Sequence, residues 1–238
     1  MDKKEFKAEV IDFIKDLVII VLIVLFIRTF LVEPFQISGQ SMSDSYYDKE
    51  FIIVDRFSYL DILDIKKWKI KRWDVIVFKP WVDKYKEYFI KRVIWIPWDK
   101  VKIVDWKVSL KKSWDEDFIE LDENSYLSDE NNWKTYVRGV KKGVIKIYDV
   151  PNKSYFVMWD NRNWSSDSRS CFASSCSFST KTNFIKKDVI TGKIFVDLGY
   201  FNFKDFSFVH PWSKNYSWLE WIITKPRFFN SPSTHNYE

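Results

Sequence analysis

Two short segments of the chain carry residues that could together perform nucleophilic catalysis. One is residues 38–42, SGQSM, which contains Ser41, and the other is an apolar run that ends at Lys91. A serine hydroxyl attacks a carbonyl only when a base takes its proton, and histidine is the usual base. Both histidines, His210 and His235, lie in a loop-like tail, so a Ser-His-Asp triad is poorly supported. Burial favours the neutral form of a lysine, which makes Lys91 a candidate base.

A third segment, residues 158–169, reads MWDNRNWSSDSR. With glycine in place of both tryptophans it would read MGDNRNGSSDSR, which resembles a signature of the type I signal peptidases. These are membrane-anchored Ser/Lys proteases that remove signal peptides from exported proteins. Residues 38–42 resemble the family's SGxSM box, YFIKRVIWIPWD resembles its lysine box, and RWDVIVF resembles its GDVVVF strand. Four boxes therefore occur in the family's order, and Gly192-Lys193 adds a weak fifth match.

The resemblance implies a role for each residue of the candidate site. Ser41 would be the nucleophile, Lys91 the general base, and Ser165 would hydrogen-bond the lysine amine and aim it. The Ser41 backbone N–H would donate a hydrogen bond to the oxyanion. Some members add a serine hydroxyl two positions before the nucleophile, but this position is Gly39 here. Met42 would line the substrate pocket. A polar and ionic scaffold beneath the site would be formed by Asp160, Asn161, Arg162, Asp167, Ser168 and Arg169.

The implied activity is that of a serine endopeptidase that needs no metal or cofactor. Its substrates would be signal peptides with small side chains, which would bind in an extended conformation as an extra strand at the edge of a sheet. The chain departs from the family after Met42, where Ser43-Asp44-Ser45-Tyr46 replaces the usual Pro-Thr-Leu. Two alternatives remain open: a catalytically impaired homologue that acts as a membrane-tethered binding module, and a specialised Ser/Lys maturation peptidase.

Residues 10–32 are predicted to form a transmembrane anchor, since residues 17–27 are continuously apolar and a span needs about 20 residues. Lysines precede it at positions 3, 4, 7 and 15, so residues 1–9 are expected in the cytoplasm and the catalytic domain outside. The protein would then be a single-pass protein of the cell membrane, in contact with the lipid bilayer and near the export machinery. A buried soluble helix and a cleaved signal peptide are the alternatives.

The body of the chain is predicted to be mainly β, a folded or barrel-like sheet within a peptidase domain at residues 33–209. Residues 210–238 are expected to form a loop-like tail, and 111–143 and 164–188 look like polar insertions. Short runs rich in β-branched and aromatic residues alternate with turn-like stretches. These runs are 51–57, 74–78, 88–96, 100–104, 144–150, 154–159 and 190–198.

Charge and cysteine content exclude some classes of function. The net charge of +5 is mild, and lysines are interleaved with acidic residues, so nucleic-acid binding is not expected. The two cysteines, Cys171 and Cys176, lack the partners of a zinc site. A disulfide and two free thiols are both compatible with the sequence.

The tryptophans are anomalous in number and in position. The chain has 13 Trp and only 5 Gly, whereas glycine averages about 7% of residues. Trp73, Trp95, Trp98 and Trp159 stand where the resembled boxes carry glycine, and Trp106 lies in a hairpin-turn position. We hypothesise that most of these tryptophans are glycines in the cell, encoded by UGA. The alternative is an aromatic-rich protein of the membrane surface.

Overall fold

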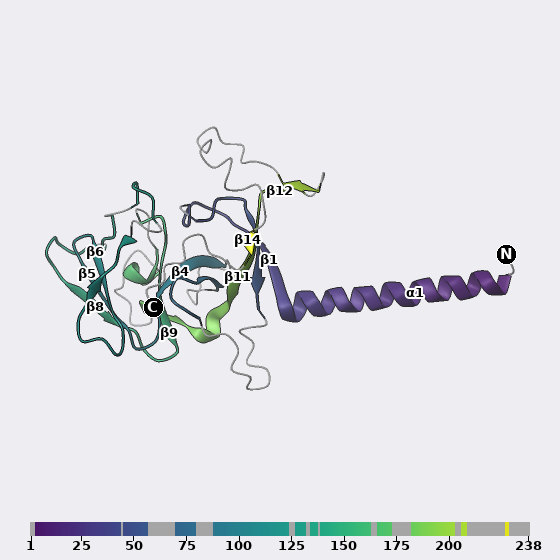
Figure 1. The fold of residues 1–238 in the computed structure, drawn as a ribbon, viewed down its shortest axis with the longest axis horizontal. Helices are drawn as coiled ribbons and strands as arrows, with labels where there is room; N and C mark the ends of the chain where they lie inside the picture. Colours follow the sequence, from purple (N-terminus) through teal and green to yellow (C-terminus); the bar gives the residue numbers. More distant parts are fainter. Residues whose placement is uncertain are drawn as a thin grey trace.

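The computed structural model describes most of the chain outside several loops and the C-terminal region. The described residues are 3–43, 45–56, 70–79, 88–123, 127–131, 134–137, 139–162, 166–172, 182–202, 206–208 and 227–228. One long helix, α1 (Lys3–Phe26), points away from a β-rich body (Figure 1). A π-helical turn, η1 (Ile27–Leu31), joins α1 to the first strand.

The body is built from antiparallel strands, as the short β-branched runs predict, and every predicted run contains a strand. The strands are β1 (Val32–Gln36), β2 (Phe51–Asp55), β3 (Val75–Phe78), β4 (Phe89–Trp95), β5 (Lys100–Val104), β6 (Lys107–Lys111), β7 (Ile119–Glu120), β8 (Lys146–Asp149), β9 (Ser154–Met158), β10 (Ile185–Lys186), β11 (Ile190–Gly199), β12 (Phe201–Asn202), β13 (Ser207–Phe208) and β14 (Arg227–Phe228). The prediction of a mainly β fold is confirmed.

The main sheet has eight strands in the order β1-β2-β11-β3-β4-β9-β10, with β14 also paired to β11. Along β2, buried and half-buried residues alternate, because one face of the strand packs on the core. Gly192 in β11 permits close approach to β2: a Cβ built there would lie 2.1 Å from the Asp55 carbonyl oxygen. The sheet carries both β1, which precedes Ser41, and β4, which contains Lys91.

A second sheet, in the order β7-β6-β5-β8, forms the end of the body far from α1 (Figure 1). A shared hydrophobic core joins the two sheets. It contains Trp73, Trp95 and Phe156 from the main sheet and its turns, and Val101 and Leu110 from the second. Another cluster, which includes Ile37, Met42, Ile52 and Val77, packs under the segment that follows β1.

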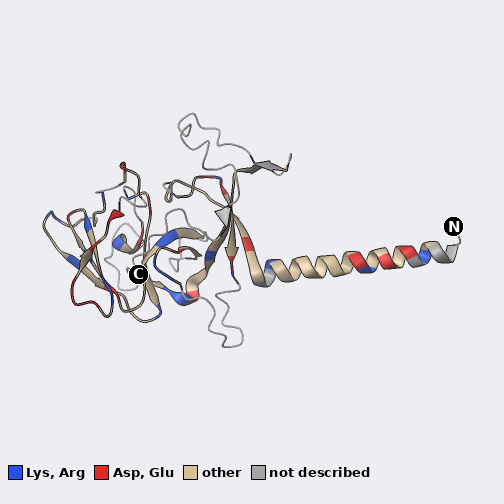
Figure 2. Cartoon of the chain, in the orientation of Figure 1, with Lys and Arg blue, Asp and Glu red and all other residues tan. Residues whose placement is uncertain are grey.

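The N-terminal helix differs from the predicted anchor at residues 10–32. It ends at Phe26, and β1 has already begun at Val32. Charged side chains, including Asp12, Lys15 and Asp16, interrupt its first half (Figure 2). Within the described residues, no helix combines the length and the apolar character that crossing a bilayer requires.

Two of the anomalous tryptophans have a backbone conformation that favours glycine. Trp73 has a φ of 72° and Trp98 a φ of 77°, in the left-handed region that bulky residues rarely adopt. The predicted hairpin turn between β5 and β6 is present, but its positive φ, 52°, falls on Asp105 and not on Trp106. The backbone therefore supports a glycine requirement at positions 73 and 98.

Candidate active site

A cleft of about 900 Å³ lies on the main sheet, and both Ser41 and Lys91 line it. One wall comes from β1 and the segment after it, which includes Gly39 and Ser41. Residues at the start of β4, Val77 of β3, and Trp159 and Asn161 of the third box also line the cleft. The fold thus brings together residues from all four sequence boxes.

The segment that carries Ser41 is held by hydrogen bonds to the third box. The backbone N–H of Asn161 donates to the Ser41 carbonyl oxygen (3.1 Å), and its side-chain amide donates to the Gln40 carbonyl oxygen (3.2 Å). Gly39, with a φ of 97°, donates its N–H to the Asp48 carboxylate (2.7 Å). These bonds fix the backbone on both sides of the hydroxyl-bearing residue, as positioning a nucleophile requires.

Met42 is fully buried beneath the cleft. It packs with Ile37, Ile52 and Val77, and these three residues also line the cleft. The side chain predicted to line the substrate pocket therefore supports the pocket floor from below.

Lys91 lies near the start of β4 and is only 2% exposed. Its Nζ donates to the Ile90 carbonyl oxygen (2.7 Å) and lies 4.4 Å from the centroid of the Trp159 ring. Burial disfavours the ammonium form and lowers the pKa of Lys91 to about 7, although the nearby carboxylates of Asp167 and Asp160 pull it upward. A substantial fraction of this amine is thus neutral at pH 7.

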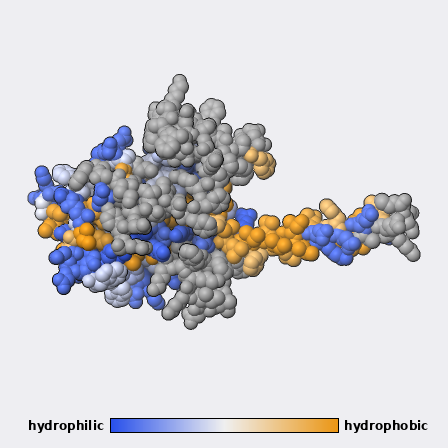
Figure 3. Space-filling model, in the orientation of Figure 1, coloured by the Kyte–Doolittle hydropathy of each residue, from blue (hydrophilic) through white to orange (hydrophobic). Residues whose placement is uncertain are grey.

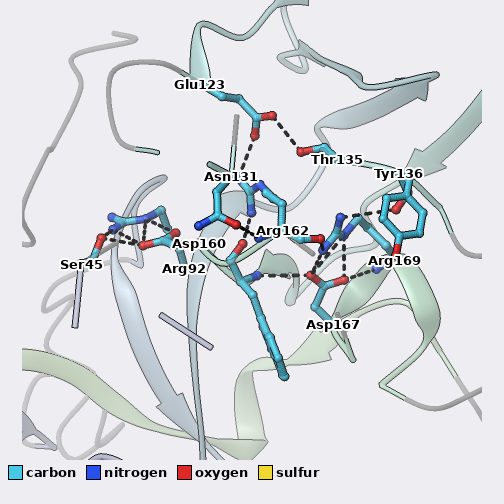
Figure 4. Close-up of polar contacts among 11 residues, drawn as sticks. Ser45, Arg92, Glu123, Asn131, Thr135, Tyr136, Asp160, Arg162, Asp167 and Arg169 are labelled. Carbon is cyan, nitrogen blue, oxygen red and sulfur yellow. Dashed lines mark hydrogen bonds and ion pairs between the residues drawn. The ribbon is translucent and has the colours of Figure 1, made fainter. Parts of the chain in front are cut away.

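Three buried ion pairs involve residues of the lysine box and the third box (Figure 4). Arg92, which follows Lys91 in β4, pairs with Asp160 (2.7 Å), and its guanidinium also donates to the Ser45 hydroxyl (2.7 Å). Since Ser45 also donates to Asp160 (2.6 Å), this cluster ties the segment after Ser41 to the lysine box and the third box. The other two pairs are Arg162 with Glu123 (2.7 Å) and Arg169 with Asp167 (2.8 Å).

Asp167 organises the end of the third box. Burial alone would raise the pKa of its carboxyl, but the Arg169 guanidinium and hydrogen bonds from the N–H groups of Arg169 and Trp159 hold that pKa below its usual value. The Ser168 hydroxyl accepts the Val157 N–H (2.9 Å). The scaffold residues thus form a connected polar network, whereas Ser165 lies outside the described residues.

Several residues of this site were not predicted from the sequence. Glu123 and Asn131, in the segment regarded as an insertion, bind the side chain and the backbone N–H of Arg162 respectively. Ser166 and Phe172 line the cleft, and Ser45 completes the Arg92 cluster. Contacts so distant in sequence leave no periodic signal, although polar residues inside weakly patterned segments could have been considered as partners for the arginines.

Neither the cysteines nor the acidic residues indicate a metal centre in the described part of the chain. No group of three or more histidine, cysteine, aspartate or glutamate side chains gathers there. Cys171 is disulfide-bonded, and Cys176 lies outside the described residues.

Comparison with known proteins identifies the family of the chain. The sequence model of a family described as signal peptidase, peptidase S26, matches residues 10–198. The chain belongs to this family. A signal peptidase I P from Bacillus subtilis subsp. natto is 31% identical over 70% of this chain and 82% of its own length. A signal peptidase I from Bacillus licheniformis is 32% identical over 68% of this chain and 80% of its own.

More distant relatives include a signal peptidase I from Rickettsia massiliae, 28% identical over 64% of this chain and 69% of its own length. A solved signal peptidase I from Enterococcus faecalis aligns with 53% of this chain and 97% of its own at 22% identity, with a TM-score of 0.34. Membership of the family makes the chain a serine endopeptidase and confirms the resemblance seen in the sequence.

Proposed function

We propose that this protein removes signal peptides from exported precursor proteins, with Ser41 as nucleophile and Lys91 as general base. The observation that carries the proposal is that both residues line one cleft while burial lowers the lysine pKa to about 7. A general base works best when its pKa is close to the working pH. Asp160, Asn161, Arg162, Asp167, Ser168 and Arg169 would serve as positioning residues.

In the proposed reaction the Ser41 hydroxyl attacks the scissile carbonyl while neutral Lys91 accepts its proton. The amine leaving group departs with a proton returned by Lys91, which leaves an acyl-enzyme. Lys91 then takes a proton from water as the water oxygen attacks the ester carbonyl, and it returns this proton to the Ser41 oxygen when the bond between that oxygen and the acyl carbon breaks. The oxyanion would be met by the Ser41 N–H, and Ser165 would aim the lysine amine.

The edge of the main sheet supports an extended peptide as substrate. β1 is the terminal strand in the sheet order, and its residues Phe35 and Gln36 line the cleft. A substrate strand added there would gain main-chain hydrogen bonds, and its side chains would alternate into and out of the cleft.

We also propose that α1 attaches the protein to a lipid bilayer, with its N-terminus in the cytoplasm and the β-rich body outside. Apolar side chains from Leu17 to Ile27 are exposed, Val18 by 51% and Leu22 by 59%, and form a continuous apolar surface apart from the body (Figure 3). Such a surface is costly in water and favourable in lipid. Alkaline extraction of membranes should leave the full chain in the membrane fraction, and protease added outside should digest the body.

The catalytic proposal is tested with matched pairs of variants and a model precursor. Ser41→Ala and Lys91→Ala should abolish cleavage, because they remove the nucleophile and the base. Ser38→Ala, an exposed serine of the same cleft, and Lys79→Ala, an exposed lysine, should retain activity. Clear cleavage by either of the first two variants would rule out the dyad.

A catalytically impaired binding module is the second candidate, and one observation favours it. The Trp159 ring lies over Lys91 inside the cleft, where it restricts the space around the amine. In this candidate the signal peptide would bind without being cut.

A further inference from the structure

The indole of Trp159 lies against the amine of Lys91 in the cleft. It lines the same cleft as Ser41 and Lys91, and its ring centroid lies 4.4 Å from the lysine Nζ. Among the described residues, the Trp159 Nε1 is one of the few buried side-chain nitrogens without a hydrogen-bond partner. A buried N–H without a partner carries a desolvation penalty. The side chain therefore fits its surroundings poorly.

The backbone of residue 159 is held independently of this side chain. Its N–H donates to the Asp167 carboxylate (3.2 Å), and its carbonyl oxygen accepts from the Arg162 guanidinium. The ring itself opposes catalysis in two ways. It covers the amine, and the negative face of an indole favours the protonated lysine, whereas the proposed reaction needs the neutral form.

The other tryptophans at resembled glycine positions are misfits too. Trp73 and Trp98 have positive φ values, and the Trp95 Nε1 is buried without a hydrogen-bond partner. The four described positions that the sequence boxes assign to glycine thus each carry a penalty in the structure, through either the backbone or the indole, and Trp164 lies outside the described residues. Exposed Trp106, in the β5–β6 turn, has no positive φ of its own.

We propose that residue 159 controls access of the scissile bond to Lys91, and that glycine occupies this position in the enzyme that the cell uses. The inference rests on the proposed function and deepens it by assigning a residue that determines access to the site. Glycine at 159 would keep both backbone hydrogen bonds and remove the ring that covers the base. The same translation of UGA as glycine would place glycine at positions 73, 95 and 98.

The first test measures binding without catalysis. Each position-159 variant is combined with Ser41→Ala in the full chain, and the dissociation constant of a synthetic signal peptide with alanines before its cleavage site is measured. Trp159→Gly and Trp159→Ala should bind the peptide at least tenfold more tightly than the tryptophan form or Trp159→Phe. Residue 159 has no positive φ, so its backbone accepts alanine as well as glycine and only the size of the side chain matters. Trp106→Gly, outside the cleft, should leave the dissociation constant unchanged.

The second test measures cleavage with Ser41 intact. Trp159→Gly should raise kcat/KM at least tenfold over the tryptophan form, and adding Ser41→Ala should remove that activity. Equal binding and equal kcat/KM for the tryptophan and glycine forms would overturn the inference but leave the proposed function standing. No cleavage by any form would overturn both.

The third test identifies residue 159 in the native protein. Trypsin cuts after Lys153 and Arg162, and the peptide 154–162 contains position 159. Its mass should be that of a glycine-containing peptide, and the gene should have TGA at this codon. Tryptophan in the native peptide, or a TGG codon, would overturn the claim that the cellular enzyme has glycine there.

Discussion

The buried amine of Lys91 should link catalysis and stability to the same titration. Its pKa falls from 10.5 to about 7 on folding, and a difference of this size corresponds to about 4 to 5 kcal/mol. Because the folded pKa lies below the unfolded one, the unfolded chain binds more protons between pH 7 and 10.5. The free energy of unfolding should therefore rise with pH across this window. Below about pH 7 the buried amine is charged, and its full destabilisation of the folded state should apply.

The informative variant is Lys91→Met, which keeps an apolar side chain of similar length and removes the titrating amine. Between pH 7 and pH 9 the wild-type free energy of unfolding should rise by about 2 kcal/mol relative to that of Lys91→Met. Urea unfolding of both full-length proteins at the two pH values measures this difference. Comparison with the variant cancels the contributions of other titrating groups, among them Tyr148, whose pKa burial raises to about 12.

The rate of cleavage should depend on the protonation state of the same amine. The rate kcat/KM of the wild type should increase about tenfold per pH unit below pH 7 and level off above it, since only neutral Lys91 accepts the serine proton. A rate that is flat from pH 5 to 7, or an equal pH dependence of stability in the wild type and Lys91→Met, would refute the reasoning. A profile lost on mutating His210 would indicate histidine chemistry instead.

Three further predictions concern stability and can be checked by urea unfolding. Arg169→Gln should lower the free energy of unfolding by about 3 to 5 kcal/mol because it leaves the Asp167 carboxylate buried without its guanidinium. The double variant with Asp167→Asn should recover much of this loss, and a double variant as unstable as Arg169→Gln alone would contradict the role given to the ion pair. Gly192→Ala should destabilise more than Gly139→Ala, because its Cβ would meet the Asp55 carbonyl oxygen, whereas alanine at Gly139 has open space and meets only the strain of a φ of 77°, about 1 to 2 kcal/mol; equal losses would contradict this. Trp98→Gly should be more stable than Trp98→Ala by about 1 kcal/mol, since φ is 77° and the side chain is 62% exposed; the reverse order would argue against a glycine position.

The strands were predictable because their side-chain pattern is local. In β2 the continuous β-branched and aromatic run FIIV predicts a strand, although the alternation of buried and half-buried residues along it appears only in the structure. The burial of Lys91 was predictable on the same basis, from the apolar residues on both sides of it. β1 was harder to separate from the preceding helix, because Val32 and Phe35 continue the apolar run of α1, and the predicted anchor therefore extended into the strand.

The polar contacts of the site could not be predicted in this way. Glu123 reaches Arg162 across 39 positions, and Ser45 reaches Asp160 across 115. A single polar side chain gives no periodic signal, so its partner becomes evident only when the sheets bring the segments together. The conformations of Trp73 and Trp98 are an intermediate case, since the turn context and the resembled boxes indicated glycine there before the backbone was known.

Two buried arginines, Arg92 of the lysine box and Arg169 of the third box, explain how a lysine can lose its proton beside two carboxylates. Asp160 and Asp167 both raise the pKa of Lys91, and unpaired carboxylates in a buried site would hold the amine in its charged form. Each of these carboxylates is instead engaged by a fully buried arginine, Arg92 or Arg169. Because these guanidinium groups satisfy the carboxylates, desolvation remains the largest influence on the amine. The ionic scaffold thus holds the segments around the cleft and also leaves the amine of Lys91, the proposed base, able to accept a proton near neutral pH.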